Sequence, residues 1–143
     1  MTDAPEFMDI FEHDPHFRGL MKRLFEVVIT HSFNAVMVTE NKPGYPIVFI
    51  NRALTDMTGY DYEDLAGQSP AVLQGPKTDQ SVLDRLKEEI SEGQLFHGQA
   101  VNYRKDGSEF MMEWKIAPIR NDKGEITHYL ALQRDITPPG GPV

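Results

Sequence analysis

The side chains that could do chemistry in this sequence are polar and aromatic groups, because cysteine is absent. The chain has 143 residues and no cysteine, which excludes disulfides, thiolate metal sites and nucleophilic thiols. It has no glycine-rich phosphate loop, no serine in a nucleophile elbow and no paired acid–base signature. Its five histidines show no metal-ligand spacing with carboxylates. We therefore expect neither an enzyme nor a metal centre.

The main binding candidates lie on segments with strand patterning. Between residues 109 and 119, Met112 and Trp114 occupy alternate positions and so share one face of the expected strand. Two interpretations follow. Either both side chains fill the interior as core, since methionine fits irregular gaps, or the indole contacts a bound ligand. Asn102 and Gln133 are likewise either polar groups hydrogen-bonded within a sheet or ligand contacts.

Hydrophobic periodicity and turn residues place these candidates on an α+β architecture. Two strands come first, a helical stretch follows, and three strands end the pattern. Asp106-Gly107 and the turn 121–124 join the last three strands as hairpins, so the sheet is largely antiparallel and its helices must cover one face. The predicted elements are strands 35–39 and 46–50, helices 51–58, 61–65 and 80–91, and strands 97–105, 109–119 and 126–136.

An amphipathic helix is predicted ahead of this body, at 16–29. Its apolar residues recur at i, i+3 and i+4, and they are Phe17, Leu20, Met21, Leu24, Phe25 and Val28. This face either packs on its own domain or pairs two copies of the chain as a homodimer. We expect an N-terminal arm and helix at 1–30, one domain at 31–137 and a disordered tail at 138–143.

The charge balance bears on partners. The net charge is −8 and the basic residues are scattered, so we expect no nucleic-acid partner and no binding to anionic membrane surfaces. The N-terminus lacks a basic region followed by an apolar one, and no run approaches the ~20 apolar residues that span a bilayer. We expect a cytoplasmic protein.

Five segments resemble, in order, the PAS domain family and, within it, the light-oxygen-voltage (LOV) subset. They are 51–60 (NRALTDMTGY), 67–75 (GQSPAVLQG, followed by PKTD), 102–107 (NYRKDG), 117–119 (API) and 132–137 (LQRDIT). The resemblance covers about residues 33–137. It implies a PAS fold, in which a five-stranded antiparallel sheet and the helices over its inner face enclose a ligand pocket. It also implies a sensory or signalling role.

The LOV subset binds FMN or FAD, and several of its binding positions are kept. The resemblance assigns Gln74 to the signature glutamine and Asn102 to the asparagine that reads the pyrimidine edge of the flavin. Gln133 falls at the last-strand glutamine that switches its hydrogen bond to the flavin. Lys87 keeps a positive charge near the second phosphate contact.

Other positions depart from the LOV pattern. Pro70 stands where the photoreactive cysteine would be, so the flavin–thiol adduct cannot form. Ser69 replaces a ribityl-contacting asparagine, Ala71 a phosphate-binding arginine and Met112 a second pyrimidine-edge asparagine. Trp114 takes the place of a phenylalanine. Losing the arginine and the asparagine costs about 1–3 kcal/mol each, yet related cysteine-less PAS redox sensors that hold FAD also depart here.

Three functional hypotheses follow from this pattern. The first is a cysteine-less flavin sensor of redox state or blue light, in which Gln133 responds to the flavin, Trp114 donates an electron and the helix at 16–29 carries the signal onward. The second is a ligand-free PAS module for dimerisation or protein interaction within a larger signalling protein. The third is a PAS pocket for another small molecule. Haem is not expected, because His97 is the only histidine near the pocket segments and helix 80–91 has none.

Overall fold

The computed structural model describes residues 15–140, excluding the side chains of residues 15 and 17. Two compact units result, residues 1–32 and 33–143, and each is considered by itself. The first holds α2 (Pro15–Thr30). The second holds β1 (Ala35–Glu40), β2 (Ile47–Ile50), α3 (Arg52–Thr58), α4 (Tyr62–Leu65), the 3-10 helix η1 (Pro70–Leu73), α5 (Gln80–Ser91), β3 (Phe96–Tyr103), β4 (Glu109–Arg120) and β5 (Ile126–Asp135).

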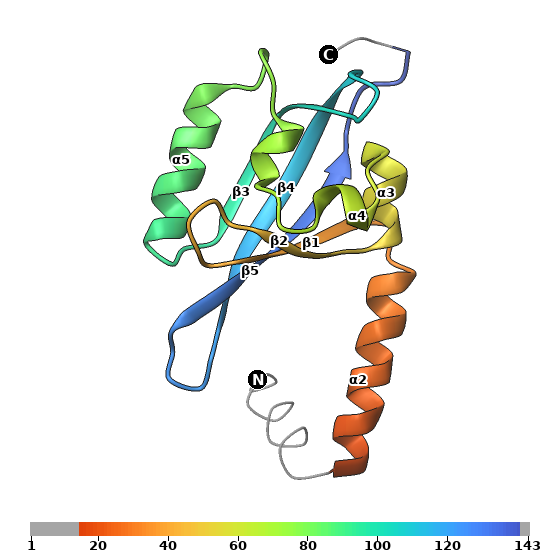
Figure 1. Cartoon of the computed structure of the whole chain (residues 1–143), viewed down its shortest axis with the longest axis vertical. Helices are drawn as coiled ribbons and strands as arrows, with labels where there is room; N and C mark the ends of the chain where they lie inside the picture. The colour runs from red at the N-terminus through yellow and green to blue at the C-terminus, as the bar shows by residue number, and fades with distance from the viewer. Residues whose placement is uncertain (1–14, 141–143) are drawn as a thin grey trace. The chain divides into compact units, whose positions relative to one another are not determined.

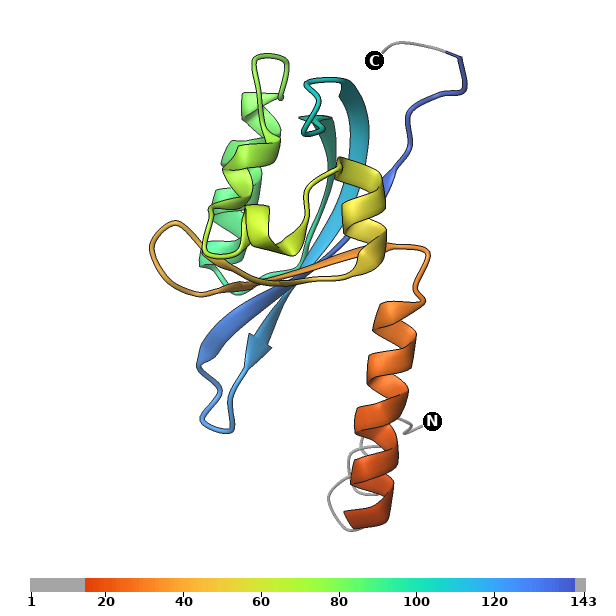
Figure 2. The ribbon, with the colours of Figure 1, turned by 45° about the vertical axis from the view of Figure 1, so that its right-hand side comes forward.

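The second unit is one antiparallel sheet with helices over one face. Its strand order is β2-β1-β5-β4-β3, and β3, β4 and β5 pair as two consecutive hairpins. Figures 1 and 2 show α3, α4, η1 and α5 on the same side of the sheet. The α+β fold expected from the sequence, with its five antiparallel strands, is confirmed.

Side-chain caps fix the start of the helices that cover the sheet. Asn51 Oδ1 accepts hydrogen bonds from Leu54 N (3.1 Å) and from Val36 N in β1 (2.8 Å), so one buried side chain both begins α3 and ties it to the sheet. Asp79 Oδ1 accepts from Ser81 N (2.9 Å) and begins α5. Gly59 ends α3 in the left-handed region at φ 80, which a glycine adopts without a steric penalty.

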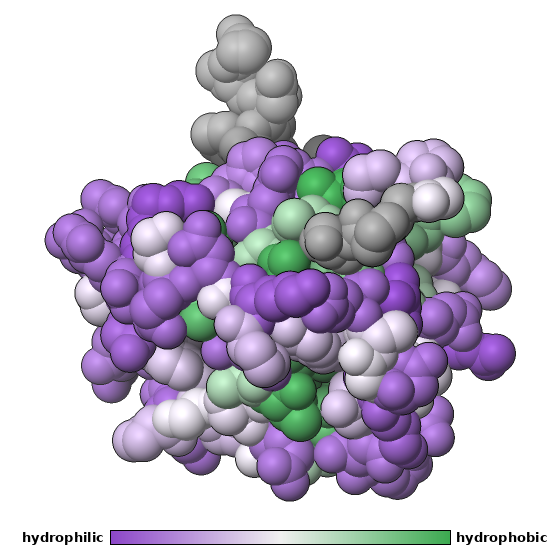
Figure 3. Space-filling model, turned by 90° about the horizontal axis from the view of Figure 1, so that it is seen from above, coloured by the Kyte–Doolittle hydropathy of each residue, from purple (hydrophilic) through white to green (hydrophobic). Residues whose placement is uncertain are grey.

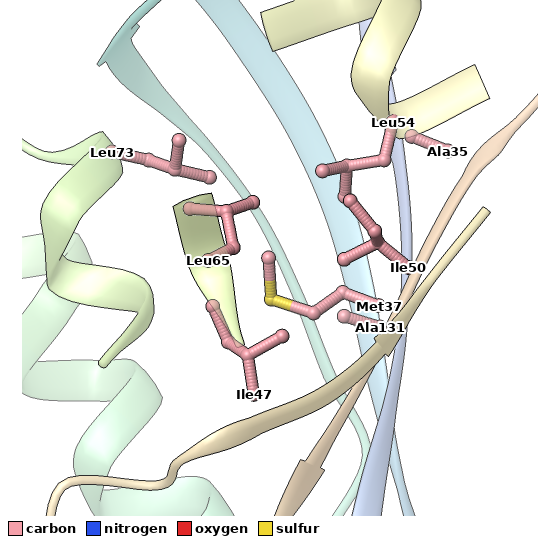
Figure 4. Close-up of a cluster of buried hydrophobic side chains, with 8 residues drawn as sticks. All are labelled: Ala35, Met37, Ile47, Ile50, Leu54, Leu65, Leu73 and Ala131. Atoms are coloured by element: carbon pink, nitrogen blue, oxygen red, sulfur yellow. The ribbon is translucent and has the colours of Figure 1, made fainter. Parts of the chain in front are cut away.

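Apolar side chains from the helices and the inner sheet face meet in two clusters. The first is drawn in Figure 4, where residues of β1, β2, α3, α4 and η1 converge. The second lies under α5, and Met112 and Trp114 belong to it. In β4, residues 110, 112 and 114 are buried while their neighbours are less so, which confirms the predicted alternation.

Two local features differ from the sequence-based expectation. The first hairpin is wider than a two-residue turn, because β3 ends at Tyr103 and Arg104 N donates to Ser108 O (2.9 Å). Lys105 N donates instead to Thr58 O (2.8 Å), which draws the turn toward the end of α3. The second difference is η1, which was not predicted; Ser69 Oγ accepts from Ala71 N (3.1 Å), and Pro70 occupies the first turn.

In the first unit, α2 is a 16-residue helix with an exposed apolar stripe. Leu20, Leu24, Phe25 and Val28 are between 47% and 63% exposed. The predicted helix at 16–29 is therefore present, one residue longer at each end. The predicted arm at 1–14 and the last three residues of the expected tail lie outside the described part of the chain.

On the outer face of the sheet, Glu113 connects the three C-terminal strands. Its carboxylate accepts hydrogen bonds from His97 Nε2 on β3 (2.8 Å) and from Arg134 Nε on β5 (2.6 Å). These bonds lower the pKa of Glu113 from its usual 4.5 to about 2. The carboxylate is therefore held ionised in the folded chain where an unfolded chain would already take up a proton.

This pKa shift predicts how stability depends on acid. Because the folded pKa lies below the unfolded one, the stabilisation from Glu113 is complete above pH 4.5 and is lost as the pH falls from 4.5 to about 2. Glu113→Gln should flatten the fall in unfolding free energy over that interval, measured by urea denaturation at stepped pH. Glu63→Gln, at an exposed position in α4, is the control. If the unfolding free energies of Glu113→Gln and the unsubstituted chain fell in parallel from pH 4.5 to about 2, this assignment would be contradicted.

Candidate functional site

A cavity of about 390 Å³ lies between the inner sheet face and the helices η1 and α5. All eight residues that the sequence assigned to cofactor binding line it: Ser69, Pro70, Gln74, Lys87, Asn102, Met112, Trp114 and Gln133. They come from η1 and its flanks, α5 and all three C-terminal strands, so segments up to 64 residues apart in the sequence, from 69 to 133, meet at one wall. The structure thus brings the predicted set together, and its cofactor role stays a prediction.

Gln133 is the most informative side chain in the cavity. It lies on β5 and is 4% exposed, and its Oε1 is buried with no hydrogen-bond partner among the described residues. A buried amide oxygen left unpaired costs about 1–3 kcal/mol, and native proteins satisfy nearly all such groups. An acceptor of this kind on a cavity wall is available to an N–H or O–H donor of a molecule in the cavity.

Asn102, Met112 and Trp114 form the wall beside Gln133. Asn102 on β3 is 2% exposed, and its Nδ2 makes only a long hydrogen bond, 3.3 Å, to Ala100 O. Trp114 packs on Phe96 with ring centroids 5.3 Å apart. Met112 and Trp114 pack as core and still leave the cavity open beside them. The core interpretation therefore holds, and contact of the indole with a ligand stays a prediction.

Two tyrosines in the cavity wall were not identified from the sequence. Tyr45 and Tyr129 meet edge to face with centroids 5.8 Å apart. Tyr129 donates its phenol O–H to Ile90 O (3.3 Å), and burial raises the pKa of Tyr129. Tyr129 and Gln133 lie an even number of positions apart on β5 and so share one face of the sheet, which could have revealed Tyr129 from the sequence. Tyr45 follows the β1–β2 turn with φ 49, a left-handed conformation that strand patterns do not anticipate.

Among residues 15–140, no histidine lines this cavity. His97 lies on the outer face, where it pairs with Glu113. The described side chains contain no group of three or more metal-ligating residues.

No described helix combines the length and the apolar character needed to cross a membrane. Figure 3 shows a mainly hydrophilic surface with small apolar areas on the end of the domain that faces the viewer.

Comparison with known proteins gives consistent matches. A family model described as "PAS domain" matches residues 34–138. The chain is 33% identical to phototropin-2 of Oryza sativa subsp. japonica over 71% of its own length, and 31% identical to a nitrogen fixation regulatory protein of Klebsiella oxytoca over 80%. A solved structure described as "Flavin Analogue Sheds Light on Light-Oxygen-Voltage Domain Mechanism" is 28% identical, with a TM-score of 0.74 over 80% of this chain and 85% of that one.

The curated relatives are much longer than the matched region. The chain spans 11% of the phototropin and 23% of the Klebsiella protein. What these matches share with the chain is therefore one sensory domain, and the activities of the whole relatives do not transfer with it.

The unpaired oxygen of Gln133 predicts an unusual effect on stability. Gln133→Leu removes the buried acceptor and fills similar space, so the ligand-free chain should gain about 1–3 kcal/mol of unfolding free energy. Urea denaturation measures the change. Gln94→Leu, the same substitution at an exposed position before β3, is the control and should stay within about 0.5 kcal/mol. A loss of stability in Gln133→Leu would show that its amide is already satisfied.

Proposed function

Because the chain belongs to the PAS domain family, we propose that it is a LOV-like sensory domain that holds a flavin, FMN or FAD, in this cavity without the photoactive cysteine. The observation that carries the proposal is the buried, unpaired Oε1 of Gln133 on the cavity wall. If this region served only as hydrophobic core, the chain would be more stable with an apolar residue at position 133.

The residues present fit a flavin in three respects. A cavity of about 390 Å³ lies within the usual range for small-molecule sites, roughly 300–1,000 Å³. Its apolar walls, which include Leu86, Trp114 and Ile116, suit a flat aromatic ring. The buried amides of Asn102 and Gln133 supply donors and acceptors for the polar edge of such a ring. Met112 removes one polar contact from this edge.

A bound flavin would supply reversible reduction and absorption of blue light. The chain's own contribution is the amide of Gln133, which can present either its oxygen or its NH₂ group and whose oxygen has no hydrogen-bond partner among the described residues. An amide that turns in response to a change of protonation at its partner exchanges an acceptor for a donor. Pro70 places no thiol on the wall, so this amide is the group best placed to respond.

A rotation of the Gln133 side chain would act on the strand that carries it, and this strand pairs with a neighbour on each side. The backbone of Gln133 pairs with Ala35 at the start of β1 and with Trp114 on β4. Ala35 comes three residues after the boundary between the two units of the chain. Two residues further along β5, Asp135 is bound by Arg104 Nη2 at 2.6 Å. These connections support output through the segments that flank the domain.

We further propose that α2 pairs two copies of the chain. Five apolar side chains on one helix are about half exposed or more, at i, i+4, i+5, i+7 and i+8 from Leu20 to Val28. Such a stripe is costly in water and is self-complementary, which suits a twofold helix pair. A cytoplasmic location and the absence of nucleic-acid partners stay predictions from the sequence.

The flavin proposal predicts a coloured protein. Purified chain reconstituted with FMN should bind it and absorb in the blue. Gln133→Leu should weaken binding about 5- to 150-fold through loss of its amide contact, measured by titration of flavin fluorescence. Gln99→Leu, exposed on the outer face, should bind as the unsubstituted chain does. A colourless chain that takes up neither FMN nor FAD would refute the proposal and favour a ligand-free PAS interaction module.

The pairing proposal predicts a dimer that depends on the apolar stripe. Phe25→Glu introduces a charge on this face and should convert a dimer to a monomer in size-exclusion chromatography with light scattering. Glu26→Lys, on the adjacent exposed position, is the control and should remain dimeric. A dimer that persists in Phe25→Glu and in Leu24→Glu would exclude α2 as the contact.

A further inference from the structure

Among the described residues that line the cavity, a single one, Lys87, carries a positive charge. We infer that the site recognises a flavin by its ring and neutral polyol chain, so that riboflavin binds nearly as tightly as FMN. This inference rests on the proposed flavin site and specifies its ligand class. It concerns the tail end of the ligand, near Ser69, Ala71, Gln80 and Lys87, and leaves the contacts of Gln133 unchanged.

Cations near the rim are few and mostly engaged elsewhere. Among the described residues that line the cavity, Lys87 is the only charged one, and it is exposed. Lys77 pairs with Glu109 at 3.2 Å. Arg85 donates to His97 O (2.9 Å) and pairs with Glu89 at 3.3 Å. A single exposed ammonium is strongly screened by water, so its attraction for a phosphate is small.

Carboxylates near the rim oppose an anion further. The N-terminus of α5, which could otherwise attract a phosphate, is capped by Asp79, whose Oδ1 accepts from Ser81 N and Oγ at 2.9 and 2.7 Å. Those bonds hold the pKa of Asp79 below its usual range, so the cap is ionised at neutral pH. Gln80, which lines the cavity, donates its amide to Asp84 Oδ1 (2.9 Å). Two carboxylates, on Asp79 and Asp84, therefore lie beside Gln80 in the cavity wall.

Neutral polar groups between the rim and the interior match hydroxyls instead. Ser69 Oγ accepts from Ala71 N (3.1 Å), which leaves its O–H free to donate. Gln74 adds an uncharged amide to the same cavity. A polyol chain can both donate to and accept from such groups, and it brings no charge that must lose its water shell.

The experiment compares riboflavin and FMN on the full-length, flavin-free chain by fluorescence titration at low and at physiological salt. The inference predicts dissociation constants within about fivefold of each other, as expected for one exposed cation. A preference for FMN of more than tenfold would overturn the inference while leaving the flavin site intact. Binding of neither compound would overturn the proposed function and this inference with it.

Substitutions at the rim give a second test that does not depend on absolute affinity. Lys87→Met should lower only FMN affinity, by about fivefold or less, until it equals that of riboflavin. Lys77→Met, which does not line the cavity, is the matched control. Ala71→Arg should raise the preference for FMN about tenfold or more, because it adds a charge-assisted phosphate contact. A loss of FMN affinity beyond twentyfold in Lys87→Met would contradict the inference.

Discussion

A hydrogen-bond acceptor buried without a donor is the constraint around which this domain is organised. Folding removes the amide oxygen of Gln133 from water and provides no partner among the described residues, at a cost comparable to a lost hydrogen bond. The sheet could have avoided this cost with an aliphatic residue, as it does at Ala131 two positions earlier on the same face. The polar residue and the cavity beside it are explained together if a ligand donor completes the pair.

This acceptor lies on the strand at the middle of the sheet. β5 is the central strand of the five, with β1 on one side and β4 on the other. The register pairs Gln133 with Ala35 and with Trp114, so a change in its side chain acts where two ladders meet. Arg104 binds Asp135 at the end of β5 and also donates to Met57 O in α3 (3.2 Å). The end of the central strand is therefore linked to the helical layer.

Much of this arrangement could be predicted from the sequence, and the rest depends on tertiary geometry. Alternation in β4 correctly oriented Met112 and Trp114, and the helices predicted at 51–58 and 80–91 were placed to within one residue, because these signals are local. Tyr45 was missed because its φ of 49 interrupts the strand pattern. The family resemblance predicted a pocket, but its volume could not be predicted, since it depends on how far α5 and η1 stand from the sheet.

The hydrogen-bonding state of the Gln133 side chain tests this account most directly. In a ¹H–¹⁵N spectrum of the side-chain amides, the Gln133 signals can be assigned by their loss in Gln133→Leu. The account predicts that FMN shifts these signals strongly, while those of Gln99, exposed on β3, stay in place. Tight FMN binding that leaves the Gln133 signals unmoved would contradict it.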